Sequence, residues 1–277
     1  MLPEGTDLLI DLAIREDLPG GDPTSESIVA EGSVSKGVFL AKEDGVLAGI
    51  DVAGRVFERI DASIRFEKAK NDGESFAFGD VLATVNGPSL WLLKAERTSL
   101  NFLQRLSGIA TYTRAFVEAV RGTKTRILDT RKTTPGWRAL EKYAVRMGGG
   151  VNHRMSLSDM VLVKDNHLAL AGSVGEALNR IRGRVPAGMA VEVEVRSLEQ
   201  AREALAGGAT MLMLDNMAPE EMREVVDWIA GRVPVEASGR MGLEGVRTVA
   251  RLGVDYISVG ALTHSFRSLD ISLEFEA

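Results

Sequence analysis

One pattern repeats six times between residues 125 and 260: a short apolar run followed by a segment with helical periodicity. The runs are TRILDT from Thr125, DMVLVK from Asp159, MAVEVEV from Met189, TMLMLD from Thr210, VPVEA from Val233 and DYISVG from Asp255. Alternating strands and helices predict a parallel sheet, and near-continuous apolar runs indicate strands buried on both faces. Six or seven such units favour closure into a TIM-type barrel, complete or incomplete. A doubly wound open sheet is the alternative.

The chain before this repeat has a different pattern. KGVFLAKEDG from Lys36 and VLATVNG from Val81 predict strands. IRFEKAKNDG from Ile64 alternates apolar and charged residues, which is typical of a strand with one solvated face. The helix that follows places an apolar stripe on one side, made by Leu93, Leu100, Leu103, Leu106 and Ala110. The first part of the chain therefore predicts a small sheet backed by helices.

Composition excludes several kinds of site and partner. The 277 residues include no cysteine, which excludes disulfides, thiolate metal sites and a cysteine nucleophile. The net charge of −6 argues against nucleic acid as the main partner, although a local cluster of Arg and Lys can still bind a small anion. The N-terminus lacks the pattern of a signal peptide, and no segment has the ~20 apolar residues that span a membrane. We therefore expect a cytoplasmic protein.

Polar residues or glycines stand at the end of every predicted strand of the repeat. In chain order they are Thr130, Arg131 and Lys132; Lys164 and Asp165; Glu194; Asp215; Ser238, Gly239 and Arg240; and Gly260 and Ala261. A single polar residue at a strand end is usually a helix cap or a turn former. In α/β barrels, however, the carboxyl ends of the strands together build the active site. We therefore expect these groups to converge on one pocket.

The chemistry of the expected pocket suits two anionic groups and a sugar. Fixed positive charge comes from Arg131, Lys132, Arg154 and Lys164, and arginine forks bind carboxylate or phosphate. The carboxylates of Glu194 and Asp215 could bind sugar hydroxyls, or a magnesium ion through water. The SGR segment at Ser238 and the VGA segment at Val259 place glycines where backbone N–H groups can approach a phosphate.

The densest run of charged and glycine residues is DTRKTTPGWRALEKYAVRMGGGVNHR, from Asp129 to Arg154. It resembles the signature of the quinolinate phosphoribosyltransferases, also called nicotinate-nucleotide pyrophosphorylases (carboxylating). Further blocks resemble the family in the same order: AERTSLNFLQRLSGIAT from Ala95, LVKDNH from Leu162, VEVEV from Val191, LMLDN from Leu212, EASG from Glu236 and SVGALTHS from Ser258. The resemblance continues to SFRSLDISLEF near the end of the chain.

The resemblance implies an α/β protein of two domains. The family has an N-terminal α/β sandwich and a C-terminal irregular, incomplete TIM-like α/β barrel. We expect the sandwich at residues 1–112 and the barrel at 113–265, with residues 266–277 packing back on the sandwich. The family's enzymes form at least dimers in which an arginine of one subunit completes the partner's site, and the matching residue is Arg97. We therefore expect a homodimer with shared active sites, and leave open whether dimers assemble further into a hexamer.

The resemblance also assigns roles to residues. Five of them would line the quinolinate pocket, with Arg138 at its edge: Arg131, Lys132, His153, Arg154 and Lys164. Glu194 and Asp215 would bind the ribose of phosphoribosyl pyrophosphate and its magnesium. Four more would hold the 5′-phosphate: Ser238, Gly239, Gly260 and Ala261. The whole expected substrate-binding set is Arg97, Thr130, Arg131, Lys132, Arg138, His153, Arg154, Lys164, Glu194, Asp215, Ser238, Gly239, Arg240, Val259, Gly260 and Ala261.

The reaction that the resemblance implies belongs to NAD biosynthesis. The ring nitrogen of quinolinate attacks the anomeric carbon as pyrophosphate leaves, and the resulting pyridinium accepts the electrons that remain when carbon dioxide departs. The product is nicotinate mononucleotide. No organic cofactor is needed, and Mg²⁺ would neutralise the pyrophosphate. We expect Lys132, Lys164, Glu194 and Asp215 to be the catalytic residues.

Other functions are open at this point. Sister enzymes on the same fold use nicotinate without decarboxylation, or are molybdenum-linked relatives of unsettled function. A barrel aldolase could use Lys164 to form a Schiff base, and a non-catalytic protein could bind the same anions without turnover. Two positions depart from the family pattern. Trp137 follows a Pro-Gly turn where a smaller residue is common, and Ser156 replaces a frequent glycine, which questions the shape of that loop.

Overall fold

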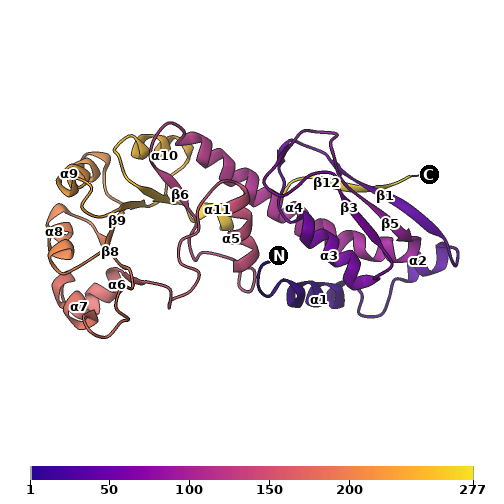
Figure 1. Cartoon of the computed structure of the whole chain (residues 1–277), viewed down its shortest axis with the longest axis horizontal. Helices are drawn as coiled ribbons and strands as arrows, with labels where there is room; N and C mark the ends of the chain where they lie inside the picture. Colours follow the sequence, from indigo (N-terminus) through magenta and orange to yellow (C-terminus); the bar gives the residue numbers. More distant parts are fainter. Residues whose placement is uncertain (1, 277) are drawn as a thin grey trace. The chain divides into compact units, whose positions relative to one another are not determined.

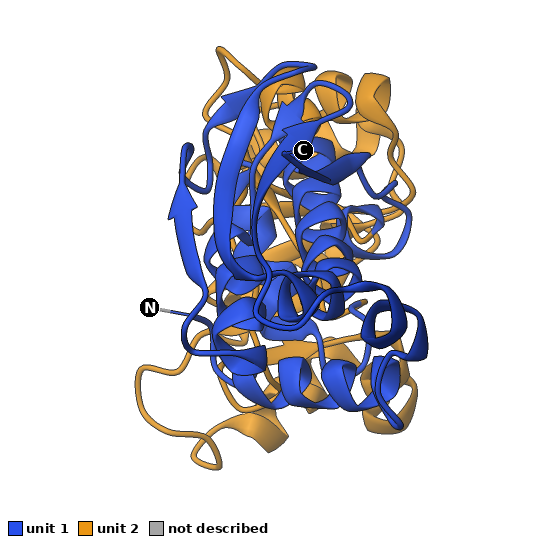
Figure 2. Ribbon diagram, turned by 90° about the vertical axis from the view of Figure 1, so that its right-hand side faces the viewer, with its two compact units in different colours: residues 1–114, 133–149, 261–277 blue, residues 115–132, 150–260 orange. Residues whose placement is uncertain are grey.

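The computed structural model describes residues 2–276 of the chain, which divide into two compact units (Figures 1 and 2). The first unit comprises residues 1–114, 133–149 and 261–277, and the second comprises residues 115–132 and 150–260. Residues 133–149, which we expected within the barrel domain, thus cluster with the first unit, as do residues 261–265.

An antiparallel sheet forms the centre of the first unit (Figure 1). Its strand order is β12-β1-β5-β3, with β12 at Ile271–Phe275, β1 at Val34–Ala41, β5 at Val81–Pro88 and β3 at Arg65–Lys68. A separate two-stranded ribbon pairs β2 (Gly45–Val46) with β4 (Ser75–Phe76). β12 pairs with β1 along its length, so the end of the chain completes this sheet.

Helices α3 (Ile50–Ile60) and α4 (Ser89–Ala119) contribute much of the apolar core of the first unit. The rings of Phe39 on β1, Phe57 on α3 and Phe66 on β3 meet with centroids 5.6–5.9 Å apart. Gly108 of α4 lies so close to the backbone of Arg267 that a Cβ atom would lie 2.2 Å from its carbonyl oxygen. The remaining helices are α1 (Thr6–Asp17), α2 (Pro23–Ile28), α5 (Arg138–Met147) and α11 (Ala261–His264).

The second unit contains a six-stranded sheet whose recorded pairs are all parallel. Its order is β6-β11-β10-β9-β8-β7, with β6 at Arg126–Leu128, β7 at Val161–Val163, β8 at Val191–Val195, β9 at Met211–Asp215, β10 at Val235–Ser238 and β11 at Tyr256–Ser258. From β7 to β11 each strand lies beside its successor, and β6 follows β11. This is the order of a barrel, whereas a doubly wound sheet reverses direction at a switch point. The sheet stays open because β6 and β7 are its two edges.

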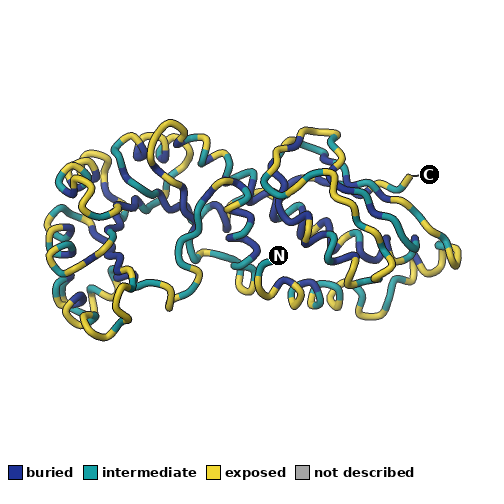
Figure 3. Tube along the Cα trace, viewed as in Figure 1, coloured by how far each residue is buried: buried dark blue, intermediate teal, exposed yellow. Residues whose placement is uncertain are grey.

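Five helices follow four of the strands, β7 to β10, in the alternation that the sequence predicts. They are α6 (Asp165–Ala171), α7 (Val174–Ile181), α8 (Leu198–Ala206), α9 (Pro219–Ile229) and α10 (Leu243–Ala250). Ser197 caps α8 by accepting the N–H of Gln200, and α9 begins with Pro219 and an acidic first turn. The strands between the helices are largely buried, as Figure 3 shows for β8, β9 and β10.

The predicted fold class is confirmed: a unit with an antiparallel sheet and helices is joined to an incomplete α/β barrel. Five of the six apolar runs contain one whole strand of the barrel, and VPVEA contains all of β10 except its last residue, Ser238. Within residues 2–276, no helix is both long enough and apolar enough to cross a membrane.

Candidate active site

A cavity of about 310 Å³ opens at the carboxyl ends of the barrel strands. It is lined by Thr130, Arg131, Lys132, His153, Arg154, Leu162, Lys164, Glu194, Met213, Asp215, Glu236, Ser238 and Ser258. All these residues belong to the second unit. The cavity thus brings together nine of the predicted residues: seven at strand ends, together with His153 and Arg154.

Sheet register explains why these side chains share the cavity. In a parallel sheet, residues directly opposite each other on neighbouring strands point to the same face. Glu194 of β8 lies opposite Met213 of β9, which lies opposite Glu236 of β10. Asp215 and Ser238 form the next pair toward the carboxyl ends. The barrel interior thus carries acidic residues, and the intervening valines and leucines pack outward against the helices.

The four predicted cations lie on one side of the pocket. Arg131 and Lys132 follow β6, Lys164 ends β7, and Arg154 lies in the segment between these strands. Arg154 is half-buried, and its Nη1 donates to the carbonyl oxygen of Met160 at 3.0 Å. Burial and the neighbouring Arg131 guanidinium lower the pKa of Arg154. Two arginines this close indicate a place for an anion, because a shared anion would relieve their repulsion.

Three carboxylates form a second group, made by Asp165, Glu194 and Asp215. One oxygen of each lies within 4.8 Å of the others. Among residues 2–276 the nearest cation to the Glu194 carboxylate in an ion pair is Arg196, at 3.9 Å from its Oε1. Burial raises the pKa of Glu194 to about 7, and the charges of Asp215 and Asp165 add to this effect. Arg196, which is exposed, forms an ion pair with Asp165 and lies 3.4 Å from Asp215 Oδ2. A cluster of oxygen ligands of this kind suits a hard cation such as Mg²⁺.

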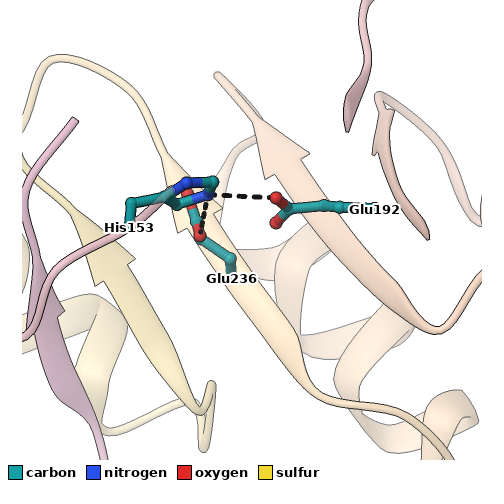
Figure 4. Close-up of side chains that lie close together, drawn as sticks. All are labelled: His153, Glu192 and Glu236. Atoms are coloured by element: carbon teal, nitrogen blue, oxygen red, sulfur yellow. Dashed lines mark hydrogen bonds and ion pairs between the residues drawn. The ribbon is translucent and has the colours of Figure 1, made fainter. Parts of the chain in front are cut away.

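His153 lies among two further acids in the barrel interior (Figure 4). Its Nε2 atom is 3.0 Å from Glu192 Oε2 and 3.4 Å from Glu236 Oε2, and both glutamates are fully buried. Burial opposes the charged imidazolium, but the hydrogen bonds and charges of the two glutamates outweigh it and raise the pKa of His153 to about 9. Burial also raises the pKa of Glu192.

A second hollow of about 390 Å³ lies beside the cavity and shares Ser238 with it. Gly239 and Arg240 line this hollow, together with residues at the starts of α9 and α10. Gly239 has φ 154°, and a Cβ atom there would lie 3.0 Å from Asn216 Oδ1. Glycine therefore keeps the backbone open at the position where the sequence predicts phosphate binding.

The other predicted residues lie outside the lining of the cavity. Arg97 is an exposed residue of α4, and Arg138 begins α5, both in the first unit. Val259 is buried and donates its N–H to Leu128, so this N–H is already engaged. Gly260 ends the second unit and Ala261 starts α11 in the first. The roles expected for these five residues stay predictions.

Sequence reasoning missed several residues of the site. Glu192, Glu236 and Ser258 lie on the strands themselves, and Arg196 directly follows β8. The sequence contained part of the evidence for the two glutamates. In VEVEV, Glu192 and Glu194 are two residues apart and therefore point to the same face of the strand, and Glu236 interrupts an otherwise apolar run. An acidic residue in a strand usually indicates a face exposed to solvent, whereas in a barrel that face of the strand can point into the interior.

An open α/β barrel with cations, carboxylates and a glycine loop at its carboxyl ends defines an enzyme class that acts on small anionic, phosphorylated substrates. Comparison with known families makes this specific. The model of the quinolinate phosphoribosyl transferase C-terminal domain matches residues 109–274, and that of the N-terminal domain matches residues 22–107. The chain belongs to the quinolinate phosphoribosyltransferase family, and the predicted family is confirmed.

Individual relatives cover nearly the whole chain. It is 47% identical over 268 residues to the nicotinate-nucleotide pyrophosphorylase [carboxylating] of Mycobacterium leprae, covering 95% of this chain and 94% of that protein. A probable enzyme of the same name from Bacillus subtilis is 44% identical and covers 94% and 89%. The crystal structure of NadC from Streptococcus pyogenes superposes with a TM-score of 0.96 at 42% identity, covering 100% and 99%.

Proposed function

We propose that the cavity of the second unit transfers a phosphoribosyl group to quinolinate, releasing pyrophosphate and carbon dioxide and giving nicotinate mononucleotide. The observation that carries this proposal is the convergence of four cations with Glu194 and Asp215 on one cavity, beside Asp165, in a member of this family. Quinolinate has two carboxylates and phosphoribosyl pyrophosphate is a polyanion, so a site for both needs fixed positive charge.

The cationic side of the cavity binds quinolinate in this proposal. Arg131 and Arg154 present guanidinium forks that can each hold a carboxylate through two hydrogen bonds. Lys132 and Lys164 are exposed at the cavity and supply positive charge without a fixed geometry. They are the groups that would stabilise negative charge during substitution and decarboxylation.

The acidic side binds the sugar. Glu194 and Asp215 accept hydrogen bonds from ribose hydroxyls, and the 5′-phosphate extends toward Ser238 and Gly239. The three carboxylates fit Mg²⁺, which prefers oxygen ligands; Asp165 would join Glu194 and Asp215 in holding it, directly or through water. When bound, the ion supplies charge neutralisation for the pyrophosphate leaving group.

Orientation is the main contribution of the protein to this chemistry. The ring nitrogen of quinolinate is neutral and carries its own lone pair, so attack on the anomeric carbon needs no general base. The side chains hold the nitrogen and that carbon in line. The entropy cost of bringing two separate substrates together is then met on binding, and the reaction itself proceeds as an intramolecular step. After the transfer, the C–C bond to the carboxylate beside the ring nitrogen breaks and carbon dioxide leaves. The pyridinium stabilises the electron pair that remains on the ring carbon, and a proton from water then bonds to that carbon to give nicotinate mononucleotide.

We further propose that the protein acts as a homodimer in the cytoplasm and that Arg97 of one subunit completes the site of the other; a hexamer of such dimers is left open. Arg97 is exposed on α4 and absent from the lining of the cavity, which is compatible with a role toward a second copy. Mixing Arg97→Ala with Arg131→Ala subunits should restore activity, because some mixed dimers hold one site with both arginines. Verified mixed dimers without activity would contradict sharing.

The direct test is incubation with quinolinate, phosphoribosyl pyrophosphate and magnesium. Pyrophosphate and carbon dioxide should appear in equal amounts, and nicotinate in place of quinolinate should give neither efficient transfer nor carbon dioxide. Transfer to nicotinate at a higher kcat/KM, or pyrophosphate release without decarboxylation, would refute the proposal and favour a sister activity.

A further inference from the structure

The barrel is open between β6 and β7, and the segment Val151–Arg154 lies along this gap. Val151 forms a parallel bridge with Leu128 of β6, in which its N–H donates to Ile127 and its carbonyl oxygen accepts from Asp129. No ladder between this segment and β7 is recorded among residues 2–276. Side chains must therefore fix the position of this segment, as backbone pairing fixes the strands elsewhere in the barrel. The segment includes His153 and Arg154, which line the cavity.

Asp129 holds the segment from the β6 side. It directly follows β6 and is fully buried. Its Oδ1 accepts the backbone N–H of His153 at 2.8 Å, and its Oδ2 accepts from Asn152 Nδ2 at 2.5 Å. A buried carboxylate is costly unless it is hydrogen-bonded, so both of its oxygens tie the segment in place.

Glu192 and Glu236 hold the imidazole ring of His153 from the far side of the barrel interior. They come from β8 and β10, with β9 between them, and both point at Nε2 (Figure 4). On the opposite edge of the ring, Nδ1 accepts the backbone N–H of Arg154 at 2.8 Å. Each ring nitrogen therefore has a protein contact, and the ring links the two glutamates to the backbone of Arg154.

This arrangement argues against a metal ion among the three side chains, although an imidazole and two carboxylates within 4.8 Å of one another are a common ligand set. A histidine that binds a metal through Nε2 normally carries a proton on Nδ1 and donates it to an acceptor. Here Nδ1 faces a donor, the N–H of Arg154. Nε2 therefore carries a proton, which it donates to Glu192 Oε2 at 3.0 Å, with Glu236 Oε2 nearby at 3.4 Å.

We propose that Asp129, Glu192 and Glu236 are positioning residues, which fix the segment Val151–Arg154 and thereby aim His153 and Arg154 at the substrate. The inference rests on the function proposed above. Asp129 and Glu192 are fully buried and do not line the cavity, so they act through other residues. Rotation of the His153 ring would release the N–H of Arg154, and a shift of about 1 Å in a substrate-binding group can cost ~100-fold in rate.

The first test compares Glu192→Gln with Glu192→Ala by varying each substrate. Glutamine keeps an oxygen that can accept from Nε2, whereas alanine removes it. We expect Glu192→Ala to raise KM for quinolinate about 10- to 100-fold, with KM for phosphoribosyl pyrophosphate within about two-fold of wild type, and Glu192→Gln to recover most of the loss. The control Glu199→Ala changes an exposed glutamate of α8 and should match wild type. Equal loss in the alanine and glutamine variants would overturn the positioning role.

The second test needs no turnover, and its deciding measurement is made on the wild-type protein. The chain has three histidines, so ¹⁵N-histidine labelling gives few signals, and His153→Gln identifies the one of interest. In the free wild-type protein the Nε2 proton of His153 should exchange slowly with water, and Glu192→Ala should accelerate the exchange at least about ten-fold. Rapid exchange in wild type would refute the arrangement even if quinolinate is turned over. Slow exchange without quinolinate turnover would instead refute the proposed function and leave the positioning of His153 intact.

Discussion

Replacement of Arg154 by alanine gives the sharpest test of which substrate lies on the cationic side. The guanidinium is half-buried beside Arg131, and its backbone is fixed through His153. A hydrogen bond to a charged group contributes about 1.5–3 kcal/mol, and each 1.4 kcal/mol is about ten-fold. Arg154→Ala should therefore lower kcat/KM for quinolinate about 10- to 150-fold. KM for phosphoribosyl pyrophosphate should stay within about two-fold, since the carboxylates and the glycine loop that bind the sugar are unchanged.

Steady-state kinetics with each substrate varied at saturating levels of the other measures both effects. Arg247→Ala, which removes an exposed arginine of α10, is the matched control for loss of one positive charge from the protein. Circular dichroism and thermal unfolding establish that Arg154→Ala is folded. An equal rise in both KM values, or a rise for phosphoribosyl pyrophosphate alone, would show that Arg154 does not belong to the quinolinate side.

Three further changes test other parts of the structure. Arg196→Ala removes the cation beside Asp165 and Asp215, so calorimetric titration should find about two- to five-fold tighter Mg²⁺ binding; weaker binding would mean that Arg196 supports the cation site. Arg105→Ala removes the ion-pair partner, 2.5 Å away, of the fully buried Glu141. Urea unfolding should show a free energy of unfolding lower by about 3 kcal/mol, and the control Arg121→Ala, which removes an exposed ion pair, should show a smaller decrease. The contacts of His153 disagree about its charge: the two glutamates raise its pKa to about 9 and favour the imidazolium, whereas Nδ1 accepts the N–H of Arg154, which requires a ring without a proton on Nδ1. A shift of pH from 10 to 7 tests this: the ¹⁵N chemical shifts of the ring should keep the pattern of the neutral Nε2–H form, and the imidazolium pattern at pH 7 would contradict the contact with Arg154.

Much of the barrel could be predicted because parallel strands are buried on both faces and therefore leave apolar runs in the sequence. The strand-end residues followed from the same topology, since all carboxyl ends of parallel strands meet at one end of a barrel. The segment containing Trp137 could not be placed in this way. Its ring stacks on Phe102 with centroids 4.8 Å apart, and Arg105 lies over its face, so contacts within the first unit decide its position. Such contacts between distant residues leave no local periodicity.

The other departure from the family pattern has a local explanation. Ser156 does not adopt a positive φ, so glycine is not required there. Its N–H donates to Asp159 Oδ2 at 3.1 Å, and its hydroxyl bonds the same carboxylate. Serine thus replaces the conformational freedom of glycine with hydrogen bonds that close the turn. The doubt that the sequence raised about this loop is answered by side-chain chemistry that composition alone does not reveal.

The order of strands around the barrel divides the cavity by chemistry. Ser238 and Ser258 end β10 and β11, and Gly239 follows β10. The cations follow β6 and β7 or lie in the segment Val151–Arg154. The three clustered acids come from β8, β9 and the start of α6. We infer that the opening of the barrel lies where quinolinate binds. A further strand pair there would commit the backbone to ladder hydrogen bonds, and its side chains would alternate between the interior and the helices. A segment that is bridged to β6 at Val151 and fixed further along by Asp129, Glu192 and Glu236 can instead turn two consecutive residues, His153 and Arg154, toward one substrate.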